Sequence, residues 1–369
     1  MWQKIKNNGN GVERNSAIEL LRIIAMIMIV FSHFAYHGKF SYLAWPLPRC
    51  WYNFIIMGGK IGVNIFVLIT GYFLIEKTKG FNLKKILKLW GQVFFYSIAI
   101  FVIVVYTKSI LYFVYHEGSI DITIKDTIGA FFPISFSKWW FVSSYFVLYL
   151  LYPFINKLLH NLSQKEYQNL IIIFLITLSV IPTLTNDLFV SSNLLWFIAL
   201  YCLAGYIKLY GLSIKLKTKH YIIIWVVTVI LVYLSYFKFE SMLYQQERIP
   251  MLIISVCMFM VFKNTKMNYH KWVNTIASAA FGVYLIHDNE YVRTFLWETV
   301  FKQFKYYNSA FLVPYSFFAV FTVFFACTFI DLVRQKTVER LYMKMIDRKI
   351  DKITAFGSKI IGAVKKIVF

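Results

Sequence analysis

Hydrophobic segments alternate with short polar connections along almost the whole chain. Ten apolar runs of about 17 to 25 residues follow one another, the length that an α-helix needs to cross a bilayer. They span approximately residues 17–36, 55–75, 88–107, 139–158, 169–185, 192–209, 220–237, 249–263, 273–289 and 309–331. This pattern predicts an all-α, polytopic membrane bundle of about ten transmembrane helices, with residues 1–335 forming one membrane domain.

The basic residues in the connections predict the orientation of these helices. Of the 39 lysine and arginine residues, 27 lie in the N-terminal segment, in alternate connections counted from it, and after the last helix. The other five connections hold 10, and Arg22 and Lys60 lie in or at the edge of helices. The positive-inside rule therefore predicts that both termini are cytoplasmic. A miscounted helix would have scrambled this alternation. We expect the first apolar run to stay in the protein as a helix, because no small-residue cleavage site follows it.

Residues 336–369 form a basic tail. From Leu332 onward, apolar residues recur at helical spacing among ten basic and three acidic residues. This pattern predicts an amphipathic helix that lies on the anionic cytoplasmic leaflet. A merely solvated basic tail is the alternative interpretation.

Composition narrows the functional classes. The chain is 59% hydrophobic and 20% aromatic, and its mean hydropathy is +0.61. Its net charge of +22 lies in short loops between apolar runs, which favours anionic lipids or an anionic cytosolic ligand over nucleic acid. The four cysteines are scattered without metal-ligand spacing, so we predict neither a disulfide framework nor a metal site. Carboxylates are almost absent from the helices, which disfavours an ion-coupled transporter.

The first hydrophobic segment carries the strongest candidate chemistry, in Glu19, Arg22 and His33. Arg22 and His33 are eleven residues apart, so on a helix they lie on one face, within ~20° of each other and roughly 16 Å apart along the axis. Ionisable residues within a membrane span are costly and suggest a function. The alternative is an arginine that reaches the headgroups and a neutral histidine that hydrogen-bonds a neighbouring helix.

Three further stretches carry candidate residues, each with an alternative. Five lysines in residues 76–88, among them Lys84, Lys85 and Lys88, follow the positive-inside rule or bind a phosphorylated cytosolic ligand. His287 is predicted at the depth of His33, where the two could share a cavity, or it is an interfacial cap beside Asp288.

The third stretch opens the fourth predicted helix. Trp139 and Trp140 are typical aromatic anchors of a membrane interface, whereas Ser143 could line a polar path between helices. No GxSxG, phosphate-binding glycine-rich loop or HExxH motif occurs. Serine hydrolase, NTPase and zinc protease functions therefore have no support.

Several of these elements together resemble the membrane acyltransferase-3 family, whose members O-acylate surface polysaccharides, lipopolysaccharide and related envelope glycans. In chain order they are Arg22-x10-His33, the Gly62–Tyr72 stretch, the basic segment 84–88, Trp140-Phe141 and Gly282-x-Tyr284-Leu285-Ile286-His287. The resemblance covers about residues 14–335. The chain departs from the family in having lysines where its basic loop is often arginine-rich, and Ile69-Thr70-Gly71 where a Ser-Gly form is usual.

The resemblance implies transfer of an acyl group, expected to be acetyl, from cytoplasmic acetyl-CoA to a hydroxyl of an envelope or extracellular polysaccharide. It implies no permanently bound cofactor and a place in the bacterial plasma membrane. Under this hypothesis His33 is the general base, Arg22 orients Glu19 and stabilises the anionic part of the donor, and lysines gather its phosphates. The residues expected to bind the donor are Arg22, Lys84, Lys85 and Lys88, and those expected to bind the acceptor are His287, Tyr284, Trp140 and Ser143.

The main alternative is an exporter or flippase of a polysaccharide or lipid-linked glycan with no chemistry of its own. A sensor or scaffold is disfavoured by the buried arginine and histidine. Consumption of acetyl-CoA by the purified protein distinguishes the enzyme from the exporter.

Overall fold

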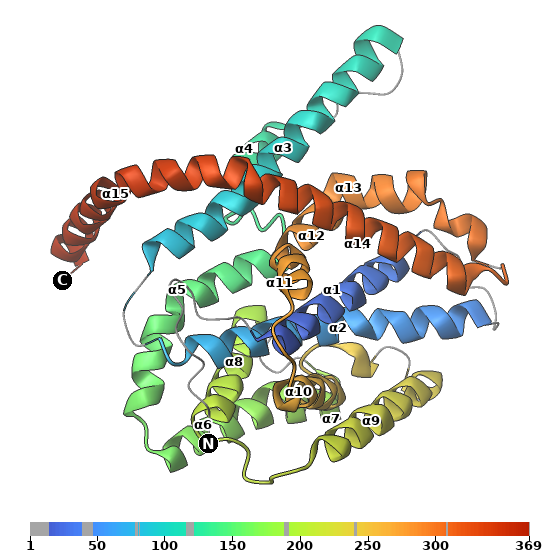
Figure 1. Cartoon of the computed structure of the whole chain (residues 1–369), viewed down its shortest axis with the longest axis vertical. Helices are drawn as coiled ribbons and strands as arrows, with labels where there is room; N and C mark the ends of the chain where they lie inside the picture. The colour runs from blue at the N-terminus through green and yellow to red at the C-terminus, as the bar shows by residue number, and fades with distance from the viewer. Residues whose placement is uncertain are drawn as a thin grey trace.

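The computed structural model describes residues 15–38, 47–77, 80, 82–115, 122–187, 192–239, 242–307 and 309–368. Within these ranges the protein is almost entirely helical and contains no β-strand. The predicted all-α helical bundle is confirmed, and Figure 1 shows its helices packed side by side.

The α-helices are α1 (Ser16–Tyr36), α2 (Leu47–Leu74), α3 (Leu83–Tyr115), α4 (Ile124–Phe131), α5 (Trp140–Asn161), α6 (Gln164–Leu175), α7 (Ile181–Thr185), α8 (Asn193–Leu209), α9 (Thr218–Phe239), α10 (Ile249–Asn264), α11 (Lys271–Ser278), α12 (Ala280–His287), α13 (Glu290–Thr294), α14 (Leu312–Lys336) and α15 (Val338–Val368). Short π-helical and 3₁₀ segments are η1 (Ile176–Val180), η2 (Met242–Tyr244), η3 (Phe295–Val300) and η4 (Gln303–Tyr306).

Each of the ten predicted segments coincides with one helix or with consecutive helical elements. In the described ranges, 8 helical stretches are long and apolar enough to cross a membrane. The sixth predicted segment is α8, a shorter apolar helix of 17 residues. The ninth is divided into α11 and α12, which meet at Ala279. The protein is therefore a multi-pass membrane bundle, while the count of ten crossings stays a prediction.

Contacts between helix ends agree with the predicted alternation of sides. The Ser16 hydroxyl, at the start of α1, accepts a hydrogen bond from the His270 backbone N–H, directly before α11, at 2.8 Å. Asn156, near the end of α5, donates to the Leu74 carbonyl at the end of α2, also at 2.8 Å. Both contacts join ends that the charge pattern places in the cytoplasm.

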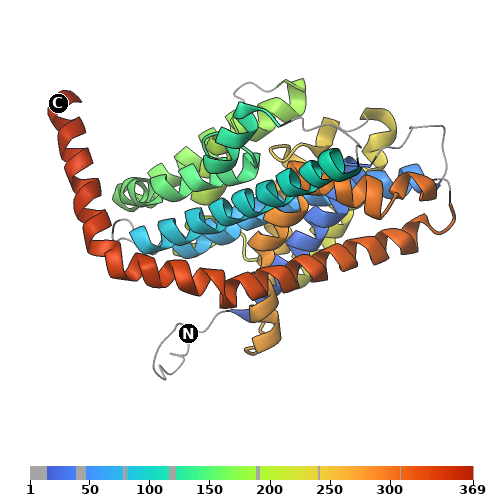
Figure 2. The ribbon, with the colours of Figure 1, turned by 90° about the horizontal axis from the view of Figure 1, so that it is seen from above.

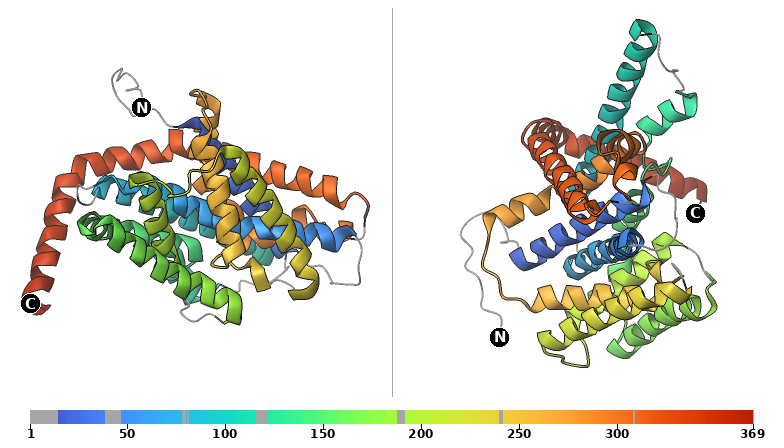
Figure 3. Two further views of the ribbon diagram at one scale, coloured as in Figure 1. Left: turned by 90° about the horizontal axis from the view of Figure 1, so that it is seen from below. Right: turned by 90° about the vertical axis from the view of Figure 1, so that its right-hand side faces the viewer.

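Helix α1 lies within the bundle and packs closely against α2 (Figures 1 and 3). The approach depends on Gly62 of α2, because a Cβ there would lie 2.7 Å from the Ala25 carbonyl oxygen and 2.7 Å from Ile29 Cγ1. Apolar side chains on several faces of α1, among them Leu21, Val30 and Phe34, are fully buried. The charged residues of α1 are therefore held in the interior of the bundle by its apolar packing.

The C-terminal tail is helical, as predicted. Helix α15 begins after Thr337, and Figure 2 shows that its distal part turns away from the bundle, across the direction of α14. Leu341, Met345, Phe356 and Ile360 are exposed on it. The first turn of α15 is packed against the bundle, because Glu339 in it is only 9% exposed. Contact of the distal part with the lipid surface remains a prediction.

Candidate active site

Helix α1 carries an ion pair near its N-terminal end. Asn15 caps the helix by accepting from the Ala17 and Ile18 backbone N–H groups, and Glu19 and Arg22 follow in the first two turns. Arg22 Nη1 donates to Glu19 Oε2 at 2.5 Å. The Glu19 side chain is 8% exposed and the Arg22 side chain 25% exposed, so Arg22 is the partner that remains accessible. The predicted pairing of these two residues is present.

Arg22 faces a cavity of about 340 Å³ at the predicted cytoplasmic end, which we name the inner cavity. Its polar and charged lining includes Arg22, Lys85, Lys88, Tyr145, Arg334 and Glu339. Three of the four predicted donor-binding residues therefore meet in one cavity. The fourth, Lys84, is not among the lining residues and pairs with Asp347 of α15 at 2.7 Å.

A buried chain of alternating charges lies beside the inner cavity. Asp331, which is fully buried, accepts from Arg334 Nε at 2.8 Å. Arg334 Nη1 continues to Glu339 Oε2 at 2.9 Å, and Lys88 Nζ lies 2.6 Å from Glu339 Oε1. Sequence reasoning missed Asp331 and Arg334, because it placed the first at the edge of a helix and the second in the tail.

At the opposite end of α1, His33 and His287 are in direct contact. His33 Nδ1 lies 2.9 Å from His287 Nε2, and His287 Nδ1 lies 2.6 Å from the Val283 carbonyl oxygen. Because a carbonyl only accepts, His287 Nδ1 carries the proton and its Nε2 is an acceptor. His33 Nδ1–H then donates to His287, which leaves a lone pair on Nε2 of a neutral His33. The two histidines, predicted to lie at the same depth in the membrane, are therefore in direct contact.

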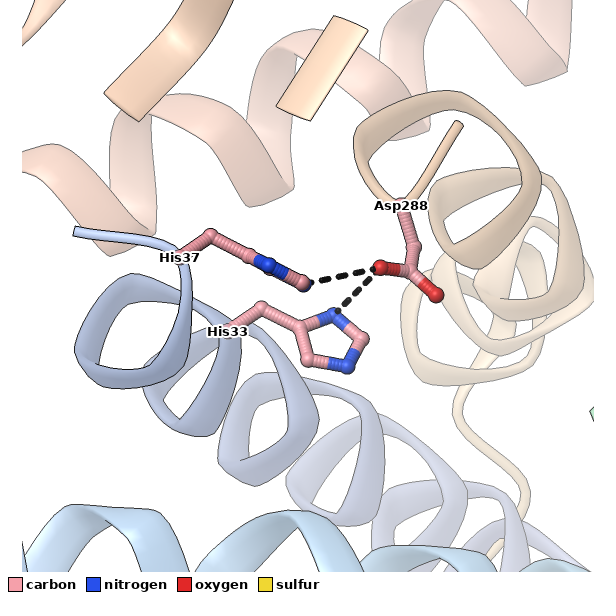
Figure 4. A group of neighbouring side chains, drawn as sticks. All are labelled: His33, His37 and Asp288. Carbon is pink, nitrogen blue, oxygen red and sulfur yellow. Dashed lines mark hydrogen bonds and ion pairs between the residues drawn. The ribbon is translucent and has the colours of Figure 1, made fainter. Parts of the chain in front are cut away.

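Asp288 and His37 extend this cluster. Asp288 Oδ1 lies 3.5 Å from His33 Nδ1 and 3.2 Å from His37 Nε2, and Figure 4 shows both imidazoles turned toward the carboxylate. Arg293 Nη1 is 3.9 Å from the same oxygen. The sequence held a signal for both residues, because His37 follows His33 by one helical turn and Asp288 follows His287 directly.

Aromatic side chains connect the inner cavity with His33. Phe141 lines the cavity, and its ring centroid lies 5.7 Å from that of Tyr284. The Tyr284 ring in turn lies 6.3 Å from the His33 ring. The rings of Phe141 and Tyr284 therefore lie between the inner cavity and the histidine pair.

A second polar cavity of about 340 Å³, the outer cavity, adjoins the histidine cluster on the other side. Its lining includes Lys125, Asp126, Lys138, Trp140, Asp288 and Arg293. Lys138 Nζ lies 2.5 Å from Glu290 Oε1 and 3.7 Å from Asp126. Hydrogen bonds from the Thr123 hydroxyl and backbone N–H hold the pKa of Asp126 below its ordinary value, so Asp126 is an anionic acceptor at neutral pH.

The predicted acceptor-binding residues thus have different positions. Trp140 lines the outer cavity, whereas Tyr284 and His287 belong to the histidine cluster. Ser143 lines neither polar cavity, and its hydroxyl donates to the Ile134 carbonyl at 2.8 Å. That bond ties the start of α5 to the loop before it.

The fold and site define a multi-pass membrane protein with a histidine pair between a basic inner cavity and a polar outer cavity. Comparison with known families matches residues 15–331 to the acyltransferase-3 family model, described as an acyltransferase domain. The chain belongs to this family, and the resemblance drawn from its motifs is confirmed. It is a membrane acyltransferase. No curated protein and no solved structure matches the chain.

Proposed function

We propose that the protein transfers an acyl group, expected to be acetyl, from cytoplasmic acyl-CoA to a hydroxyl of an envelope or extracellular polysaccharide. The bacterial plasma membrane is its expected location. The observation that carries this proposal is the hydrogen-bond chain from His33 through His287 to the Val283 carbonyl, which leaves a lone pair on His33 Nε2. A neutral imidazole with a free nitrogen between two cavities is suited to act as a general base.

The inner cavity is the proposed donor site. Arg22, Lys85 and Lys88 would bind the phosphates of coenzyme A, and the contact with Glu19 would hold Arg22 in place. The rise of roughly 16 Å between Arg22 and His33 is comparable to the reach of a pantetheine arm. Phosphates held in the inner cavity would therefore allow the thioester to extend toward His33.

Transfer at His33 is a single proton shuttle. The acceptor hydroxyl gives its proton to His33 Nε2 while its oxygen attacks the thioester carbonyl. The C–S bond then breaks, and the imidazolium returns the proton to the departing thiolate. Asp288 Oδ1, 3.5 Å from His33 Nδ1, would stabilise the imidazolium between these steps. General-base catalysis of this kind contributes typically about 10² to 10⁴-fold in rate.

The outer cavity is the proposed acceptor site. The face of Trp140 offers an apolar surface for the C–H groups of a sugar ring, and Asp126 offers an acceptor for its hydroxyls. Lys60 Nζ stands 5.5 Å from the Trp140 ring centroid and would hold that ring in place. Roles for Tyr284, His287 and Ser143 in acceptor binding remain predictions.

The decisive experiment replaces His33 by glutamine, which hydrogen-bonds but takes up no proton at neutral pH. Release of free thiol from acetyl-CoA with a glycan acceptor should fall by about 10² to 10⁴-fold, while expression and the thermal unfolding midpoint are retained. His270→Gln, at an exposed histidine on the predicted cytoplasmic side, is the matched control and should keep full activity. Substantial activity in His33→Gln would reject the base, and no consumption of acetyl-CoA by the parent would favour the exporter.

The donor site has its own test in two lysines one turn apart. Lys88→Ala should raise the KM for acetyl-CoA more than it lowers kcat, because a phosphate contact acts about equally in the ground and transition states. Lys84→Ala should change KM little, since Lys84 pairs with Asp347 and is not among the cavity's lining residues. Added salt should weaken donor binding more in the parent than in Lys88→Ala. Equal effects of the two substitutions would contradict the assignment of the inner cavity.

A further inference from the structure

His33, His37 and Asp288 bring three potential metal ligands together at the outer end of α1 (Figure 4). One ligand atom from each residue lies within 4.8 Å of the other two. The carboxylate oxygen is 3.5 Å from His33 Nδ1 and 3.2 Å from His37 Nε2. Zinc bonds of about 2.0 to 2.2 Å in a tetrahedral site put ligand atoms roughly 3.3 Å apart. Two of the three separations already match this geometry.

His287 adds a fourth nitrogen to the cluster. Its Nε2 lies 2.9 Å from His33 Nδ1, and its Nδ1–H is held by the Val283 carbonyl. A metal-ligating histidine is typically oriented in this way, by a backbone acceptor on its other ring nitrogen. His287 is fully buried, and the hydrogen bond to Val283 fixes its ring with the Nε2 lone pair directed toward His33. Three imidazoles and one carboxylate are a donor set that suits zinc.

We propose that this cluster is an inhibitory binding site for a divalent transition metal ion, with Zn²⁺ as the best fit. The ligands are His33 Nδ1, His37 Nε2 and Asp288, with His287 Nε2 available as the fourth. The inhibitory part of the proposal rests on the function proposed above. The site lies at the end of α1 that the charge pattern places outside, and the side chains of His33 and His37 are 17% and 16% exposed. External metal therefore reaches it without crossing the membrane.

Inhibition follows from the tautomer of His33. Because the Val283 carbonyl makes His287 Nε2 an acceptor, His33 Nδ1 carries the proton in the metal-free protein and Nε2 has the lone pair. A metal ion at Nδ1 needs a lone pair on that nitrogen, so the single proton of the neutral ring moves from Nδ1 to Nε2. His33 then has no site that accepts the proton of a hydroxyl. His37 Nε2–H donates to the Asp288 carboxylate in the metal-free protein, so its one proton moves to Nδ1 when Nε2 binds the ion. Binding therefore changes the positions of protons and not their number. Arg293, 3.9 Å from Asp288, opposes the ion and weakens the site.

Metal binding is measured on the purified full-length protein in detergent after removal of metals by a chelator. Titration with Zn²⁺ should show one saturable equivalent, and Co²⁺ should give the intense visible absorption of a low-coordinate site. His37→Ala should weaken Zn²⁺ binding at least tenfold, and so should Asp288→Asn, which keeps the side-chain shape. His270→Ala is the control and should bind like the parent. Absence of a saturable equivalent, or binding by His37→Ala equal to that of the parent, would overturn the site.

Inhibition is measured against each variant's own metal-free rate of acyl transfer. Saturating Zn²⁺ should slow the parent at least tenfold, a chelator should restore the rate, and His37→Ala should lose this sensitivity. Acyl transfer that Zn²⁺ leaves unchanged or stimulates would overturn the inhibitory role. His37-dependent binding by a protein that shows no acyl transfer without metal would support the metal site and overturn the proposed function instead.

Discussion

Asp331→Asn should strongly destabilise the bundle. The Asp331 carboxylate is fully buried and accepts from four side chains. Tyr96 donates to Oδ1 at 2.7 Å, Arg334 Nε to Oδ1 at 2.8 Å, Gln92 to Oδ1 at 3.2 Å and Gln335 to Oδ2 at 2.7 Å. Asparagine offers one acceptor oxygen and an NH₂ group, so at least one donor would face another donor. The substitution also removes a negative charge beside the buried Arg334.

The magnitude follows from what Arg334 retains. Removing one partner of a buried ion pair costs about 3 to 5 kcal/mol. Arg334 keeps its 2.9 Å contact with Glu339, so we expect the lower end of that range, about 3 kcal/mol. Arg334→Gln should cost a similar amount, because it leaves Asp331 without its cation. The double variant removes both charges, so its loss should fall short of the sum of the single losses by about 1 to 3 kcal/mol.

Thermal unfolding in detergent, followed by loss of the monodisperse chromatographic peak, ranks the four proteins. Asp347→Asn is the control, because Asp347 is 50% exposed in its pair with Lys84 and should contribute at most about 1 kcal/mol. Additive losses in the double variant would refute the coupling of Asp331 and Arg334. An unfolding midpoint of Asp331→Asn equal to that of Asp347→Asn would show that the buried Asp331 carboxylate contributes no more to stability than an exposed one.

Three shorter predictions concern other parts of the bundle. His287→Leu should lower kcat about 10 to 100-fold with little change in the donor KM, because His33 Nδ1–H loses its acceptor; initial rates at varied acetyl-CoA test this. Gly282→Ala should lower the unfolding midpoint, because the added Cβ would overlap the Asp331 carboxylate, and a midpoint equal to the parent's would contradict this contact. In a variant without native cysteines, a cysteine at Lys217 should react with an impermeant reagent only after lysis and one at Glu247 on intact cells; the reverse would contradict the orientation.

The sequence predicted the helices well because membrane spans produce long, uninterrupted hydropathy signals. It did not predict the division between α11 and α12, since the run through Ala279 is apolar on both sides of the interruption. The short length of α8 was predicted, because the expected segment at residues 192–209 nearly coincides with Asn193–Leu209. Hydropathy measures the solvent that a segment meets, and it is insensitive to a break that neighbouring helices cover.

The candidate site was predictable where its residues share one helix and less so elsewhere. The spacing of Glu19, Arg22 and His33 was readable because helical periodicity converts sequence distance into direction. The contact between His33 and His287 depends on how α12 packs against α1, so the sequence indicated only a common depth. Arg334 is buried between Tyr96 of α3 and Glu339 of α15, in tertiary contacts that no local pattern encodes.

Glu339 already occupies the position that a phosphate of the proposed donor would take beside Lys88. This carboxylate lies 2.6 Å from Lys88 Nζ and balances its positive charge. An arriving donor would exchange one anion for another, which moderates its affinity. The reverse exchange would speed the departure of the coenzyme after transfer. The ion pair with Arg334 holds Glu339 close to Lys88, so its carboxylate can bind the lysine again as the phosphate leaves. Glu339, in the first turn of α15, would then compete with the coenzyme phosphates for Lys88 and prevent coenzyme A from remaining bound after transfer.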